Sequence, residues 1–103
     1  MKIIFFNNVE IKVTIERDSS GTFGFSIRRG TNVIDYISPG GPAALHGGIN
    51  AGDMIIEINS IPVDEKSDVM KLLSNIGQTL YMVIKKKGRL FCLKHAFELI
   101  LIK

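Results

Sequence analysis

Few residues in this chain have the type and spacing that catalysis or metal binding requires. Ser19, Ser20 and Ser26 could act as nucleophiles, but an activated serine needs a histidine and an acid arranged behind it, and the sequence offers no such combination. His46 and His95 have no acidic or cysteine neighbours at the spacing of metal ligands. We therefore expect no catalytic residue, no bound metal and no cofactor, and the chain is not expected to be an enzyme.

One short segment has the composition of an anion-binding turn, namely residues 22–25 with the sequence Thr-Phe-Gly-Phe. Consecutive backbone N–H groups in a turn that contains glycine can converge on one point and bind an anion. Gly24 has no Cβ, so the backbone can curl there and a carboxylate can approach closely. Residues 21–26 lack the Gly-Lys-Ser/Thr sequence of a nucleotide phosphate loop. The turn therefore lacks the signature of a nucleotide-binding loop.

Short apolar runs separated by glycine and proline surround this turn and indicate a small β-rich domain. Apolar residues alternate with polar ones from Val9 to Glu16, which predicts an amphipathic strand. By the same reasoning we expect further strands over residues 23–28, 33–37, 54–58, 61–63 and 79–84.

Two helices are expected between these strands, over residues 42–46 and 64–75. Pro42 suits the first position of a helix, because its fixed φ is helical and its missing N–H would be unpaired there. The second helix should begin with Asp64 as its N-cap and end before Gly77. Its apolar residues recur at spacings of three and four, and the core-facing stripe is Val69, Leu72 and Ile76.

Length and charge exclude several classes of protein. The 103 residues suffice for one domain, and Cys92 is the single cysteine, so no internal disulfide can form. The net charge is +3, but residues 85–103 carry +5 and the remainder −2, so the body lacks the basic face of a nucleic-acid binder. No apolar run approaches the roughly 20 residues that cross a bilayer. We expect a soluble cytoplasmic chain that binds no nucleic acid.

The turn and the elements after it resemble a PDZ domain. Residues 22–25 resemble the Gly-Leu-Gly-Phe carboxylate-binding loop of that family, and residues 37–43, 48–49 and 52–59 follow in the family's order. The resemblance covers residues 9–87, in the non-permuted order of animal scaffold proteins. It implies a small, partly open antiparallel β-barrel of five or six strands with two α-helices. Residues 1–8 would then be an N-terminal extension and residues 88–103 a C-terminal tail.

The resemblance also implies a function, the binding of C-terminal tails of partner proteins by β-strand addition between the second strand and the second helix. Carried over by position, the N–H groups of Phe23, Gly24 and Phe25 would bind the ligand carboxylate, and Arg17 would support it through water. The pocket for the last ligand side chain would be formed by Phe23, Phe25, Ile27, Met70 and Leu73.

Two further residues are expected to set ligand specificity, Ser26 and Lys66. Lys66 stands at the start of the predicted second helix, where many family members carry histidine to bond a Ser or Thr hydroxyl two residues before the ligand's end. Lysine has three donors and a positive charge at neutral pH. We therefore hypothesise a preference for Asp or Glu at that ligand position.

The expected partners are C-terminal peptides, including those of membrane receptors or channels, and the expected location is the cytoplasmic side of the membrane periphery. The alternative is a degraded family member that acts through dimerisation or through anionic lipids bound by residues 85–87, which are three lysines. The tail over residues 88–103 matches nothing in the family. It could add a strand or helix, mediate self-association, or be a poorly packed end, and the sequence does not decide between these.

Overall fold

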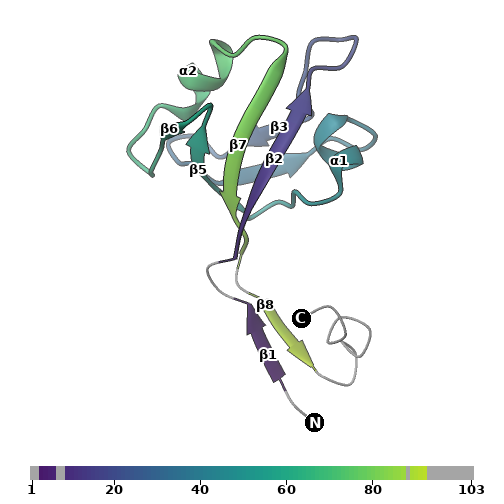
Figure 1. Ribbon diagram of the computed structural model, residues 1–103, viewed down its shortest axis with the longest axis vertical. Helices are drawn as coiled ribbons and strands as arrows, with labels where there is room; N and C mark the ends of the chain where they lie inside the picture. Colours follow the sequence, from purple (N-terminus) through teal and green to yellow (C-terminus); the bar gives the residue numbers. More distant parts are fainter. Residues whose placement is uncertain (1–2, 7–8, 88, 93–103) are drawn as a thin grey trace.

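A computed structural model describes the backbone of residues 3–6, 9–87 and 89–92, and the side chains of residues 9–87. Its main body combines two antiparallel sheets with two short helices (Figure 1). The predicted mainly β fold is confirmed, and two elements, α1 and β5, have the predicted bounds. The elements of the main body are β2 (Glu10–Glu16), β3 (Phe25–Ile27), β4 (Ile34–Ile37), α1 (Pro42–His46), β5 (Met54–Ile58), β6 (Ile61–Pro62), α2 (Val69–Ser74) and β7 (Thr79–Lys85).

The two sheets are joined on one side and open on the other. The larger sheet has the strand order β2-β7-β5-β6, and β3 pairs with β4 in the smaller sheet. Val33 and Met54 form a bridge between the sheets, and the Ile34 N–H donates to the Asp53 carbonyl at 2.8 Å. Among the described strands, β3 pairs with β4 alone, so its other edge is unpaired. The arrangement is partly open, as predicted, and does not close into a barrel.

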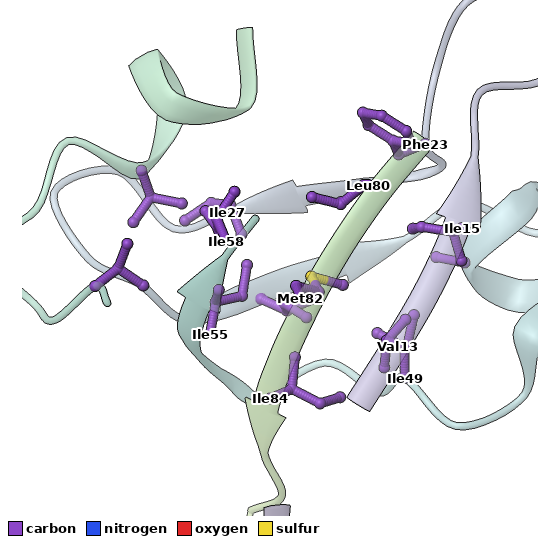
Figure 2. Close-up of a cluster of buried hydrophobic side chains, with 14 residues drawn as sticks. Val13, Ile15, Phe23, Ile27, Ile49, Ile55, Ile58, Leu80, Met82 and Ile84 are labelled. Carbon is purple, nitrogen blue, oxygen red and sulfur yellow. The ribbon is translucent and has the colours of Figure 1, made fainter. Parts of the chain in front are cut away.

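The core lies between the two sheets, and strand alternation places it there. In the β2–β7 pair, Val13 is opposite Met82 and Ile15 is opposite Leu80, and all four side chains are buried. Burying one aliphatic side chain of this size contributes about 1.5–3 kcal/mol. The remaining buried apolar residues complete the cluster (Figure 2): Phe23, Ile27, Ile34, Ala43, Ile49, Ile55, Ile58, Val63, Val69 and Ile84.

The predicted start of the second helix is wrong, because α2 begins at Val69 and not near Asp64. The side chain of Asp64 accepts the Lys66 N–H at 2.8 Å, and its carbonyl accepts the Ser67 N–H at 3.1 Å, so these residues form a turn. Asp68 is the N-cap, and its carboxylate accepts the Lys71 N–H at 3.1 Å. Asp64 and Asp68 are both suited to the N-cap position, and the helix begins after Asp68. The predicted core stripe is confirmed, since Val69 is buried and its partners pack against the core.

A buried carboxylate ties the segment before β5 to the end of β7. Asp53 is fully buried, and its side chain accepts hydrogen bonds from the Lys86 ammonium at 2.5 Å, the Asn50 N–H at 2.8 Å and the Lys87 N–H at 3.1 Å. The Lys86 ammonium also donates to the Gly48 carbonyl at 2.9 Å. Lys86 is therefore part of the interior network at this end of the sheet.

The segments on either side of the main body meet in a separate two-stranded sheet. Strand β1 (Ile3–Phe6) pairs antiparallel with β8 (Arg89–Cys92), and the pair extends away from the main body in Figure 1. Residues 89–92 thus form a strand whose described partner is β1, in a sheet of its own. Residues 93–103, His95 among them, lie outside the described residues. In the described part of the chain, no helix has the length and apolar character needed to span a membrane.

Candidate functional site

The predicted anion-binding turn is preceded by a loop that Asp18 organises. One carboxylate oxygen of Asp18 accepts the Ser20 hydroxyl at 2.6 Å, the Ser20 N–H at 2.9 Å and the Thr22 N–H at 3.2 Å. The hydrogen bond from the Ser20 hydroxyl, followed by that from the Thr22 backbone, lowers the pKa of Asp18. The Gly21 N–H donates to the Asp18 carbonyl at 2.9 Å and closes the loop. The loop is thus held in a defined conformation by its own hydrogen bonds.

Gly24 occupies a backbone conformation and a space that require glycine. Its φ is +83°, and a Cβ built on it would lie 3.0 Å from Pro42 Cδ. Its N–H donates to the Thr22 hydroxyl oxygen at 3.0 Å, and its carbonyl accepts the Ser38 N–H at 2.8 Å. The turn therefore packs directly against the start of α1, and one of the predicted carboxylate donors is paired with Thr22.

Strand β3 leaves this turn with backbone groups directed to an unpaired edge. The Gly24 carbonyl accepts from Ser38 beside β4, and the Arg28 N–H donates to the Val33 carbonyl at 2.9 Å. Hydrogen-bonding direction alternates along an antiparallel strand. The N–H and C=O of Phe25, the residue after Gly24, therefore point away from β4. That edge has the hydrogen-bonding capacity to accept an added strand.

The five predicted pocket residues lie at different depths. Phe23 and Ile27 belong to the buried core, with Phe23 beside Leu80 in Figure 2. Phe25 and Leu73 are half-buried and pack against the core margin, while Met70 on α2 is 59% exposed. Of the five, Phe25, Leu73 and Met70 are therefore the ones with side-chain surface open to contact.

Arg17, predicted to support the carboxylate, contacts backbone carbonyls on two sides of the turn. Its guanidinium donates to Gly21 O at 2.8 Å, Ile76 O at 2.9 Å and Gly77 O at 2.9 Å. The guanidinium carbon also lies 4.4 Å from the centroid of the Phe23 ring. The arginine therefore joins the turn to the segment that follows α2.

The two predicted specificity residues are both exposed. Ser26 lies on β3 opposite Tyr36 of β4. Lys66 lies in the turn before α2, three residues before the helix begins, so the expectation that it starts this helix is wrong. It follows Asp64 and Glu65 directly, and these carboxylates reduce the positive potential near its ammonium.

Sequence reasoning missed the roles of Asp18 and Thr22 in the turn. Neither side chain is among the candidate site residues drawn from the sequence. The signal was present, because Asp and Thr side chains commonly bond backbone N–H groups two residues on, as Asp18 does with Ser20 and Thr22 with Gly24.

A concavity of about 500 Å³ lies elsewhere on the main body, between α1, β2 and β7. It is lined by Thr14, Ile15, Glu16, Pro42, Leu45, His46, Thr79 and Tyr81, and it shares no lining residue with the predicted site. Within the described residues, no group of three or more His, Cys, Asp or Glu side chains is placed to hold a metal ion. The turn at Gly24 and the unpaired edge of β3 remain the candidate site.

Comparison with known proteins shows what this chain is similar to. The family model for the PDZ domain matches residues 12–85. Glutamate receptor-interacting protein 1 of Rattus norvegicus is 31% identical over 93 residues, which is 80% of this chain and 8% of that protein. Disks large homolog 2 of Rattus norvegicus is 30% identical over 102 residues, covering 82% of this chain and 12% of that protein. Gamma-1-syntrophin of Mus musculus is 35% identical over 86 residues, which is 77% of this chain and 17% of that protein. The chain thus spans less than a fifth of the length of these relatives.

Proposed function

This chain belongs to the PDZ domain family, and on that premise we propose that it binds the C-terminal ends of partner proteins. It is a protein-interaction module. The ligand would lie extended along the unpaired edge of β3, between that strand and α2, with its terminal carboxylate at the turn before β3. Main-chain hydrogen bonds to the strand edge would supply affinity, and side-chain pockets would supply selectivity.

The observation that carries the proposal is the position of Gly24 directly before the unpaired edge of β3. The carboxylate would be bound by the N–H groups of Phe23, Gly24 and Phe25, which leave the turn in succession. A carboxylate that accepts several backbone N–H groups gains charge-assisted hydrogen bonds, each contributing about 1.5–3 kcal/mol. Because the Gly24 N–H donates to Thr22 in the free protein, ligand binding would replace that bond.

The last ligand side chain would be apolar. Phe25 and Leu73 are half-buried against the core and Met70 is exposed, so these three would contact the ligand side chain, with the buried Phe23 and Ile27 below them. Burying a Val- or Leu-sized side chain there would contribute about 1.5–3 kcal/mol. Association and ordering cost at least about 4 kcal/mol, so the expected complex has a dissociation constant of roughly micromolar order. Such an affinity suits reversible assembly.

Specificity at the third-from-last ligand residue would come from Lys66 and Ser26. We propose that the Lys66 ammonium favours Asp or Glu there. Since Lys66 is exposed and lies before α2, the preference should be modest, because exposed ion pairs contribute about 0.2–1 kcal/mol. That range corresponds to a selectivity of about 1.4- to fivefold.

The partners we propose are proteins with free, apolar C-termini, including membrane receptors or channels. One similar protein is named as a glutamate receptor-interacting protein, which supports this class of partner. The chain would then work on the cytoplasmic side of a membrane as a module that holds or localises its partner. The wider activity of a longer protein containing this domain would follow from the partners that its other parts bind.

Contact with anionic lipids through residues 85–87 has less support. The Lys86 ammonium is bound to Asp53, Asn50 and Gly48, so two of the three lysines remain to contact a surface. Co-sedimentation with phosphatidylserine vesicles would test this function. The variant to use is Lys85→Ala with Lys87→Ala, which retains Lys86, and light scattering of the same samples would report dimerisation.

An unbiased screen of displayed C-terminal peptides tests the proposed function. We expect apolar last residues to be enriched, and Asp or Glu to be enriched two positions before the end. The acidic enrichment should disappear in Lys66→Ala, while the apolar enrichment should persist. Recovery of peptides without any preference at the last position would contradict the proposal, and acidic enrichment that survives Lys66→Ala would contradict the assignment of Lys66.

A further inference from the structure

Arg17 is placed where it can control the geometry of the turn. It directly follows β2, and its backbone is held by Gln78 on the entry to β7. The Arg17 N–H donates to the Gln78 carbonyl at 3.0 Å, and the Gln78 side chain donates to the Arg17 carbonyl at 2.9 Å. The side chain therefore starts from a fixed position between the turn and the end of α2.

From that position, the guanidinium connects the loop before the turn to the segment that follows α2. Nη1 bonds the Gly21 carbonyl in the loop before the turn. Nε and Nη2 bond the carbonyls of Gly77 and Ile76 in the segment that follows α2. Such contacts need a planar group with donors in several directions, which guanidinium has and ammonium does not.

The same guanidinium also covers the first aromatic ring of the turn. Its carbon lies 4.4 Å from the centroid of the Phe23 ring, within the range of a cation–π contact. Phe23 is 7% exposed, so its ring is held between the core and Arg17. Since the ring fixes the orientation of this residue, Arg17 also constrains the backbone N–H groups that follow.

We propose that Arg17 is a positioning residue, whose guanidinium fastens the turn to the segment after α2 and so holds the N–H groups of Phe23 and Gly24 ready for a carboxylate. This inference rests on the proposed function. It replaces the expectation that Arg17 supports the carboxylate through water. The required property is the shape of the donor group, so lysine at this position should fail even though it keeps the charge.

The test compares Arg17→Lys and Arg17→Gln with wild type and with Arg28→Lys. Arg28 is an exposed arginine whose ion pair with Asp35 spans 3.7 Å. Arg28→Lys therefore controls for the effect of replacing an arginine by a lysine. A C-terminal peptide from the screen is titrated in its free and amidated forms. We expect Arg17→Lys to weaken binding of the free peptide by about tenfold, close to Arg17→Gln, because several charge-assisted hydrogen bonds are lost. Arg28→Lys should bind as wild type does.

Two readouts test the proposal. The ratio of free to amidated affinity should fall in Arg17→Lys and stay unchanged in Arg28→Lys, because the N–H groups that Arg17 positions bind the carboxylate of the free peptide; wild-type affinity for the free peptide in Arg17→Lys would overturn the proposal. Hydrogen exchange of the ligand-free proteins gives the second readout. The Gly21 and Gly24 amides should exchange faster in Arg17→Lys than in Arg28→Lys, and unchanged exchange would overturn the proposal whether or not the wild type binds peptides. If wild type binds the free and amidated peptides equally, the proposed function is wrong. The hydrogen-exchange result still decides whether Arg17 positions the turn.

Discussion

The amide nitrogen of Gly24 lies 3.0 Å from the hydroxyl oxygen of Thr22, which accepts its hydrogen bond. Gly24 would provide the central donor of the proposed carboxylate site, and this N–H is paired with Thr22. The Thr22 hydroxyl oxygen and the ligand carboxylate would therefore compete for the same N–H group. The other contacts of the turn determine how readily the carboxylate replaces the hydroxyl.

Thr22→Val is expected to bind C-terminal peptides more tightly than wild type. Valine keeps the β-branched shape but removes the acceptor, so the Gly24 N–H would be free for the carboxylate. A net hydrogen bond contributes about 1 kcal/mol, which corresponds to about fivefold in affinity. Isothermal calorimetry would measure the change, with Thr22→Ser as the control that keeps the hydroxyl. Weaker binding by Thr22→Val would mean that the hydroxyl contacts the ligand.

Gly24→Ala is expected to abolish peptide binding and to destabilise the fold, and Gly30→Ala is its matched control. Both glycines have positive φ, +83° and +75°, but a Cβ at Gly24 would meet Pro42 at 3.0 Å, whereas at Gly30 it would meet nothing within 4 Å. Gly30→Ala should lose about 1–2 kcal/mol of unfolding free energy from strain, and Gly24→Ala should lose about 1–3 kcal/mol more from overpacking. Equal losses in chemical denaturation would contradict the close approach of the turn to α1.

The carboxylate of Asp18 is expected to stabilise the loop at neutral pH and to lose this effect in acid. Hydrogen bonds from Ser20 and Thr22 lower its pKa in the folded protein. Its contribution is therefore present above the unfolded pKa of about 3.9 and disappears as the pH falls through the lower folded pKa. Asp18→Asn should be less stable than wild type at neutral pH, and the difference should shrink in acid. Urea unfolding across this range measures it, with exposed Glu65→Gln as the control, and a difference that grows in acid would contradict the assignment.

Lys86→Met is expected to destabilise the domain more than the same change at an exposed lysine. The side chain of Asp53 is 1% exposed and that of Lys86 is 18% exposed, so the variant would leave a buried carboxylate without its cation. Breaking such a pair costs about 3 kcal/mol, whereas exposed Lys12→Met should change stability by less than about 0.5 kcal/mol. Thermal and chemical unfolding would compare the two, and similar stabilities would show that Lys86 is solvated.

Local pattern was enough to predict most of the strands, the first helix and the importance of Gly24. Alternation along β2 and the proline at the start of α1 are signals contained within a few residues. The start of α2 could not be predicted with the same certainty, because Asp64 and Asp68 are both good N-caps and the choice depends on where Val69 packs. The misplacement of Lys66 followed from that choice.

The contacts of Arg17 could not be predicted from local pattern either. Its partners Ile76 and Gly77 are about sixty residues away in the sequence, and only the folded chain brings these carbonyls within reach. The pairing of β1 with β8 similarly joins segments from opposite ends of the described chain. Both cases depend on the topology of the whole domain, whereas the turn at Gly24 depends on residues beside it.

The most direct test of the account follows the backbone amides of Phe23, Gly24 and Phe25 by two-dimensional NMR during titration with one peptide in two forms. With a free C-terminus, we expect these three amide protons to move furthest downfield, as they would on donating hydrogen bonds to a carboxylate. Amidation of the same peptide should remove these shifts and weaken binding by at least about tenfold, since charge-assisted hydrogen bonds are lost. Equal affinity for both forms, with the three amides unmoved, would contradict the account.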